Sequence, residues 1–185
     1  MEKVLVTGAT GYIGLHCIHQ LLNQGYAVNG SVRSPERKDE IINALISHNT
    51  STDYLNLYTF NLTEDDGWDE GMQGCDFLMH VASPIAVEHT DEEYFVQPAV
   101  DGVKRALRFA KKHNVKKVVF TSSVAAIFDT IEKKTSFDES DWSDPNNPAI
   151  SAYSKSKTLA ERTAWEFVKD ENHPFELAVI NPALV

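Results

Sequence analysis

The fold of this chain is decided by the stretch Val4-Leu5-Val6-Thr7-Gly8-Ala9-Thr10-Gly11-Tyr12-Ile13-Gly14. A short apolar, β-branched run leads into three glycines spaced three residues apart, and an amphipathic segment from Leu15 to Leu22 follows them. This order predicts a strand, a tight turn and the start of a helix. The turn needs glycine because a Cβ would block the approach of main-chain N–H groups to a ligand. Those N–H groups, together with the positive end of the helix, form a site suited to a pyrophosphate.

The glycine turn therefore predicts a dinucleotide site, and an ordinary turn between a strand and a helix is the alternative. The flanking segments favour the dinucleotide, because a strand pattern precedes the glycines and a helix pattern follows them. The predicted cofactor contacts in this turn are Gly8, Thr10, Gly11, Tyr12, Ile13 and Gly14.

Length and composition indicate one soluble domain. At 185 residues, 42% hydrophobic and 24% charged, the chain can bury a sizeable core. The net charge of −10 argues against nucleic acid and against an anionic membrane as partners, because both require a basic surface. No apolar run approaches the roughly 18 residues of a membrane span, and the strand after Met1-Glu2-Lys3 leaves no room for a secretory leader. We therefore expect a cytoplasmic protein with reduced cysteines at positions 17 and 75.

Strand-like runs alternate with helix-like segments along the chain, which predicts an α/β fold with a doubly wound parallel sheet. After the first strand and helix, the expected strands are 26–32, 54–62, 77–82, 118–121 and 175–180. The expected helices are 37–47, a short helix ending at Met72 behind an acidic cap at 63–66, 91–113 and 153–169. Residues 129–150 form the one long irregular segment. A strand order of 3-2-1-4-5-6 then places the ligand crevice over the first and fourth strands.

The end of the second strand favours NADP(H) over NAD(H). A ribose-binding acid is expected about twenty residues after the glycines, but no Asp or Glu occurs between Tyr26 and Pro35. Arg33 stands there instead, with Lys38 close behind it. A guanidinium binds a 2′-phosphate bidentately, whereas a carboxylate would repel it; the alternative is that Arg33 only solvates the strand end. Val81-Ala82-Ser83 ends the fourth strand, where the main chain is expected to line the cofactor.

Tyr153 and Lys157 stand four residues apart at the start of a predicted helix, which places them on one face. A phenol with its ordinary pKa near 10 is a poor acid at neutral pH, but an ammonium about 4 Å away stabilises the ionised form by roughly 4 kcal/mol. Tyr153 would then pass a proton to a carbonyl oxygen as hydride reaches the carbon. The alternative is a solvated helix face, on which a Tyr-x-x-x-Lys pattern is common by chance.

The seven histidines show no spacing suited to metal ligation, so no metal site is expected.

The glycine turn, the Tyr-x-x-x-Lys pair and the strand end at Thr121-Ser122-Ser123 together resemble the extended short-chain dehydrogenase/reductase superfamily. Three further stretches narrow the resemblance to the dihydroflavonol reductase/cinnamoyl-CoA reductase group, which includes ketone and aldehyde reductases of bacteria and yeasts. They are Val81-Ala82-Ser83-Pro84, Phe137-Asp138-Glu139-Ser140-Asp141-Trp142 and Ser156-Lys157-Thr158-Leu159-Ala160-Glu161. The resemblance covers the whole chain and implies NADPH-dependent reduction of a small-molecule carbonyl substrate to an alcohol.

The same resemblance implies roles for individual residues. Ser123, with Ser122 as the fallback, would polarise the substrate oxygen, Tyr153 would donate the proton, and Lys157 would also hold the nicotinamide ribose. Asn61 would bond the exocyclic amine of the adenine, in a position where the superfamily often has Asp. The remaining implied cofactor contacts are Leu62, Thr121, Ser122, Tyr153, Pro182, Leu184 and Val185.

Extended reductases typically continue for more than a hundred residues that build a substrate-binding lobe. We therefore expect residues 1–185 to be the NADP(H)-binding Rossmann domain of a fragment that lacks this lobe, as a monomer or homodimer of low activity. Two other functions stay open: an NAD-dependent nucleotide-sugar epimerase or dehydratase, and a non-catalytic cofactor-binding protein. Arg33 argues against the first, and the retained pair of Tyr153 and Lys157 argues against the second.

Overall fold

The structure is a computed structural model that describes residues 1–84, 92–129 and 134–185. Its strands are β1 (Lys3–Thr7), β2 (Ala27–Val32), β3 (Leu55–Thr59), β4 (Phe77–His80), β5 (Lys117–Thr121) and β6 (Glu176–Ile180). Its α-helices are α1 (Tyr12–Asn23), α2 (Lys38–Ser47), α3 (Trp68–Met72), α4 (Glu92–Lys112) and α5 (Ala152–Asp170), and two short 3₁₀ turns lie at Pro35–Arg37 and Val124–Ala126. Asp91, where the sequence predicts the start of the long helix, and residues 130–133 of the predicted irregular segment lie outside the described residues.

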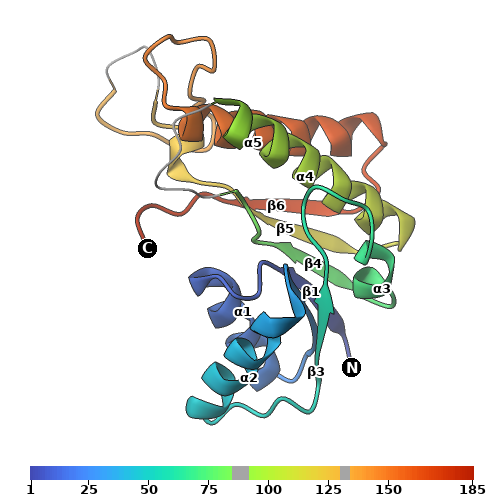
Figure 1. Cartoon of the computed structure of the whole chain (residues 1–185). Coiled ribbons are helices and arrows are strands. Elements are labelled where there is room, and N and C mark those ends of the chain that lie inside the picture. Colours follow the sequence, from blue (N-terminus) through green and yellow to red (C-terminus); the bar gives the residue numbers. More distant parts are fainter. Residues whose placement is uncertain (85–91, 130–133) are drawn as a thin grey trace.

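The six strands form one parallel sheet in the order β3-β2-β1-β4-β5-β6 (Figure 1). The predicted strand order is therefore confirmed. β1 lies between β2 and β4, with Leu5 opposite Asn29 on one side and Leu78 on the other. The chain places β2 and β3 on one side of β1, and then β4, β5 and β6 on the other side. The carboxyl ends of β1 and β4 therefore flank the place where ligands bind in such sheets.

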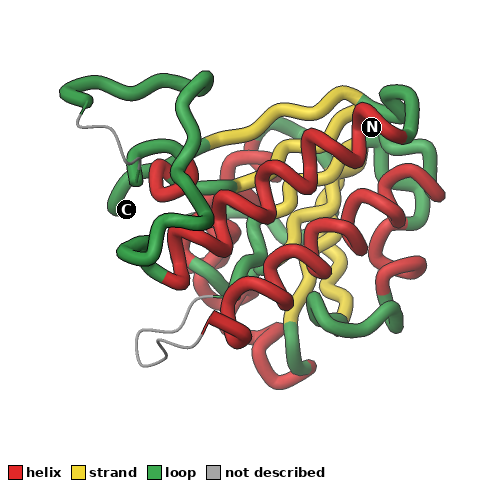
Figure 2. Tube along the Cα trace, turned by 90° about the horizontal axis from the view of Figure 1, so that it is seen from above, coloured by secondary structure: helices red, strands yellow, loops and turns green. Residues whose placement is uncertain are grey.

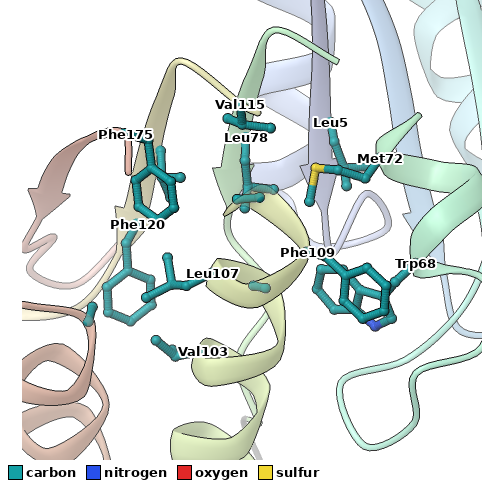
Figure 3. Close-up of a cluster of buried hydrophobic side chains, with 14 of the residues drawn as sticks. Leu5, Trp68, Met72, Leu78, Val103, Leu107, Phe109, Val115, Phe120 and Phe175 are labelled. Carbon is teal, nitrogen blue, oxygen red and sulfur yellow. The ribbon is translucent and has the colours of Figure 1, made fainter. Parts of the chain in front are cut away.

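Helices cover both faces of the sheet, and the residues of β1 alternate between the two cores. Val4 and Val6 pack into the cluster that α1 and α2 complete, whereas Leu5 packs into the cluster beneath α3, α4 and α5. Successive strand residues point to opposite faces, so a strand buried on both sides is apolar throughout. Figure 3 shows the second cluster, in which the ring of Trp68 stacks on that of Phe109 with centroids 5.8 Å apart. The two long helices, α4 and α5, lie side by side over this face (Figures 1 and 2).

The acidic cap predicted at residues 63–66 is wrong. The short helix α3 begins after Gly67, which adopts a left-handed conformation with φ 81° and makes no side-chain cap. The Asp65 carboxylate instead accepts hydrogen bonds from Arg105 and Arg108 on α4, both at 2.6 Å. Two guanidinium groups, brought close by the packing of α4, attract this carboxylate more strongly than free helix N–H groups do.

Several element ends also differ from the prediction. β3 is shorter than the predicted strand 54–62, and β4 ends at His80, two residues before the predicted end. Beyond His80, the N–H groups of Val81 and Ala82 bond to a threonine side chain, so the strand ladder stops there. In the described parts of the chain, no helix is long and apolar enough to cross a membrane, and no three His, Cys, Asp or Glu side chains cluster as metal ligands would.

Candidate active site

A cleft of about 750 Å³ lies over the carboxyl ends of β1 to β4. Most of the predicted cofactor contacts line it: Gly8, Thr10, Gly11, Tyr12, Ile13, Gly14, Arg33, Asn61, Leu62, Val81, Ala82, Ser83 and Val185. Its described lining contains two arginines and no Asp or Glu side chain, although the chain as a whole carries a net charge of −10. The cleft is therefore suited to an anionic ligand.

The glycine turn forms the floor of this cleft with very little room for side chains. A Cβ on Gly14 would lie 2.2 Å from the Gly8 carbonyl oxygen, and one on Gly8 would lie 3.0 Å from Cα of Ala82. Gly8 also has φ +72°, a conformation that side chains disfavour. α1 begins directly after Gly11 without a side-chain cap and without an acidic residue in its first turn. Tyr12, Ile13 and Gly14, whose N–H groups have no partner within the helix, line the cleft.

Two side chains from neighbouring strands hold the turn in place. The Ser31 hydroxyl, at the carboxyl end of β2, accepts a hydrogen bond from the Gly8 N–H at 3.0 Å. Thr7 Oγ1 lies 2.9 Å from Nδ1 of His80 and accepts the N–H groups of Val81 and Ala82, both at 3.1 Å. The sequence analysis missed Thr7 and Ser31, although their positions at strand ends beside the glycines are a usable signal.

The basic residues after β2 differ in their surroundings. Arg37 lines the cleft but donates hydrogen bonds to Glu40 at 2.9 and 3.1 Å. Arg33 is exposed on the cleft wall and, within the described parts of the chain, forms no salt bridge. Lys38 is half-buried at the start of α2 and is not among the residues that line the cleft. Of these three cations, Arg33 is thus the one that an incoming phosphate meets without competition from a carboxylate.

Asn61 lines the cleft, but its side-chain oxygen, expected to bond the adenine amine, forms hydrogen bonds within the protein. Its Oδ1 accepts hydrogen bonds from the N–H and the hydroxyl of Thr63, at 2.7 and 2.6 Å. The oxygen that would accept the exocyclic amine of an adenine is therefore already occupied, and Nδ2 is the group left to face a ligand. Further lining residues that the sequence analysis did not assign are Ser31, Arg37, Phe60, Thr63, Pro84, Tyr94 and Pro98.

Tyr153 and Lys157 lie on α5, whose start is set by a serine cap. Ser151 Oγ accepts the N–H of Ser154 at 3.0 Å, which satisfies one of the free donors at the helix end. The Lys157 ammonium lies 5.7 Å from the centroid of the Tyr153 ring. The four-residue spacing therefore brings the two side chains together.

Lys157 is buried, with only 4% of its surface exposed, which the sequence did not predict. Burial lowers its pKa to about 8, and the Glu161 carboxylate opposes that change. Burial, and then the charge of Lys157, lower the pKa of His80 to about 3. His80 is accordingly neutral at pH 7.

Ser122 and Ser123 follow β5 and are both buried. Ser123 caps the short turn Val124–Ala126, and its Oγ accepts the N–H of Ala125 at 3.2 Å. Ser122 Oγ has no hydrogen-bond partner among the described residues. The predicted residues outside the described lining of the cleft are Lys38, Thr121, Ser122, Ser123, Tyr153, Lys157, Pro182 and Leu184. The described lining of the cleft thus includes none of the three predicted catalytic residues, Ser123, Tyr153 and Lys157.

Comparison with known proteins gives a consistent result. A family model described as the NAD dependent epimerase/dehydratase family matches residues 4–182. A bifunctional dihydroflavonol 4-reductase/flavanone 4-reductase of Pyrus communis is 36% identical over 191 residues, and cinnamoyl-CoA reductase 1 of Petunia hybrida is 37% identical over 188 residues. Both matches cover 100% of this chain and 54% of the relative. The chain therefore spans about half the length of these curated relatives.

The fold matches solved reductases as well. The yeast methylglyoxal/isovaleraldehyde reductase Gre2, solved in complex with NADPH, superposes with a TM-score of 0.83 at 34% identity. That match covers 98% of this chain and 57% of the yeast chain. The predicted resemblance to the dihydroflavonol reductase/cinnamoyl-CoA reductase group is confirmed by these relatives.

Proposed function

The chain belongs to the NAD dependent epimerase/dehydratase family, and we propose that it is the NADPH-binding and catalytic part of a carbonyl reductase. The observation that carries the proposal is the cleft over the glycine turn, with two arginines and no Asp or Glu side chain in its described lining. The relatives support it, because they are named as reductases and the yeast structure contains NADPH. These observations favour an oxidoreductase that acts on a small molecule.

The residues of the cleft suit the adenosine and pyrophosphate parts of the cofactor. The Gly8–Gly14 turn leaves main-chain N–H groups open where a Cβ would fill the space, which suits a pyrophosphate. The Arg33 guanidinium, which pairs with no carboxylate among the described residues, suits a 2′-phosphate and favours NADPH over NADH. Asn61 offers Nδ2, so we propose that it donates to a ring nitrogen of the adenine and not that it accepts the exocyclic amine.

The chemistry follows from the Ser123, Tyr153 and Lys157 side chains. NADPH supplies the hydride to the carbonyl carbon when it is bound. Ser123 would hold the carbonyl oxygen, and Tyr153 would donate its phenolic proton to that oxygen as negative charge develops. Lys157, in contact with the Tyr153 ring, would stabilise the phenolate that remains. We propose that the substrate pocket is completed by a further lobe, and that residues 1–185 form the cofactor domain.

The cofactor proposal is tested by titrating the chain with NADPH and with NADH. Arg33→Ala should weaken NADPH binding by about tenfold to a hundredfold and leave NADH binding nearly unchanged, since a charged hydrogen bond contributes about 1.5–3 kcal/mol. Arg37→Ala is the matched control, because Arg37 lines the same cleft but is paired with Glu40. Equal affinity for both cofactors in the parent, unchanged by Arg33→Ala, would contradict the proposal.

The catalytic proposal is tested on the full-length protein with methylglyoxal and isovaleraldehyde as probe substrates. Tyr153→Phe should lower kcat by roughly a hundredfold or more and leave NADPH affinity nearly intact, since only the proton donor is removed. Tyr54→Phe, at an exposed tyrosine far from the helix, is the control. Reduction at the parental rate by the Tyr153 variant would rule out this proton donor.

A further inference from the structure

Glu161 is a buried carboxylate one helical turn after Lys157 on α5. Only 5% of its surface is exposed. Its Oε2 accepts a hydrogen bond from Asn181 Nδ2 at 2.8 Å, and Trp165 Nε1 lies 3.5 Å from Oε1. Taking a carboxylate out of water has a desolvation cost, which hydrogen-bond donors and a nearby positive charge offset.

Asn181 links this carboxylate to the strand end that carries Ser123. Its Nδ2 donates both to Glu161 and to the main-chain carbonyl of Ser123, the latter at 3.1 Å. The Val124 N–H in turn donates to the Pro182 carbonyl at 3.0 Å. The end of β6 is therefore bonded to α5 on one side and to the segment after β5 on the other.

The charged and titratable groups around Lys157 come from two elements. Tyr153 and Glu161 flank it on its own helix, and His80 faces it from β4. His80 is neutral at pH 7, because its pKa is lowered to about 3. The residues that α4 contributes to the buried core beside α5 are apolar: Ala99, Val103, Ala106, Leu107, Phe109 and Ala110. Glu161 is thus the negative charge in the described surroundings of Lys157.

We propose that Glu161 is a positioning residue, which Asn181 holds in place and whose carboxylate keeps the buried Lys157 side chain positively charged at neutral pH. The inference rests on the proposed function, in which the charged form of Lys157 serves the Tyr153 phenol. Because Glu161 and Lys157 are four residues apart on one buried helix face, their interaction is weakly screened by solvent. Without this carboxylate, burial alone acts on Lys157 and favours its neutral form.

The experiment follows the Lys157 side chain by NMR in the 185-residue chain labelled with ¹³C at lysine Cε, as a function of pH. Glu161→Gln keeps the shape and an oxygen acceptor for Asn181 but removes the charge. It should lower the midpoint of the Lys157 titration by on the order of one pH unit. Glu166→Gln, at an exposed position on the same helix, should leave the midpoint unchanged.

A second variant keeps the test valid if the first does not fold, as judged by circular dichroism. Glu161→Asp retains the charge but withdraws it by one methylene, so the midpoint should fall by less than in Glu161→Gln. A Lys157 midpoint that is the same in the parent and in every folded Glu161 variant would overturn the inference. The NMR titration needs no cofactor. Failure of the parent to bind NADPH would therefore be recognised separately, as a failure of the proposed function.

Discussion

Thr7 Oγ1 lies 2.9 Å from Nδ1 of His80, and this contact determines which nitrogen of the imidazole carries a proton. The same hydroxyl already accepts the N–H groups of Val81 and Ala82, so its own hydrogen is the one directed at His80. Nδ1 therefore accepts, and the proton of the neutral ring is on Nε2. Protonation of Nδ1 would break this contact and introduce a charge beside Phe120, whose ring centroid lies 5.7 Å from that of His80.

The first prediction concerns stability in mild acid. The pKa of His80 in the folded protein is about 3, below its ordinary value of 6.5, so only the unfolded chain binds the proton as the pH falls below 6.5. The contribution of His80 to stability is complete above pH 6.5 and is lost towards pH 3. At 1.36 kcal/mol per pH unit, the parent should lose about 2 kcal/mol between pH 6.5 and pH 5.

Urea unfolding at pH 7, 6 and 5 measures this loss. His80→Gln should remove most of the pH dependence in that range, whatever its stability at pH 7. His16→Gln, at an exposed histidine, should retain it. The prediction fails if the parent and His80→Gln lose stability in parallel between pH 7 and pH 5.

The second prediction concerns the glycine turn. Gly14→Ala would place a Cβ 2.2 Å from the Gly8 carbonyl oxygen, so the turn must move. We expect a loss of about 1–3 kcal/mol in unfolding free energy and loss of NADPH binding, since the turn is the expected pyrophosphate site. Gly25→Ala, at the other end of α1, meets nothing within 4 Å and strains only its own φ of +85°. It should cost about 1 kcal/mol and leave NADPH affinity unchanged. Wild-type affinity in Gly14→Ala would contradict this assignment of the turn.

The third prediction concerns Ser143, which is fully buried in the irregular segment before α5. Its hydroxyl donates to the Ala125 carbonyl and accepts the Asp129 N–H, both at 2.8 Å, and its own N–H donates to the Ala126 carbonyl. Ser143 thus ties this segment to the turn that follows Ser123. Ser143→Ala should lower the unfolding free energy by about 1–3 kcal/mol, because two main-chain groups lose their partner.

The matched control for this position is Ser140→Ala, at an exposed serine of the same segment whose hydroxyl, among the described residues, bonds to the nearby Asp138. It should change the unfolding free energy by less than about 0.5 kcal/mol. Both values come from urea unfolding followed by tryptophan fluorescence. Equal effects of the two substitutions would show that the Ser143 hydrogen bonds add little to stability.

The fourth prediction concerns Cys75. Burial raises the pKa of its thiol to about 11, so very little reactive thiolate forms at pH 8. In Cys17→Ala, the remaining thiol should react with Ellman's reagent only as fast as the chain unfolds, and at once in denaturant. Rapid labelling of the native Cys17→Ala variant would show that the region around Cys75 opens without global unfolding.

The glycine turn and the individual strands could be predicted because they depend on local patterns. An apolar run followed by glycines at positions 8, 11 and 14 predicts a strand and a turn, whatever the remainder of the chain does. The alternation of strands and helices then leaves few ways to build a parallel sheet. The acidic segment before α3 shows the limit of this reasoning, because Asp65 bonds to arginines forty and more residues later.

In the candidate site too, some features depend on neighbouring residues and others on segments that are distant in the sequence. The sequence by itself determined the turn, the position of Arg33 after β2 and the spacing that brings Tyr153 and Lys157 together, since each needs only neighbours within a few residues. Only the tertiary structure decided that Lys157 is buried, with Glu161 held in place by Asn181 and with a neutral His80 nearby. Burial and charge coupling depend on which distant segments pack together, and β4, α5 and the end of β6 meet only in the folded protein.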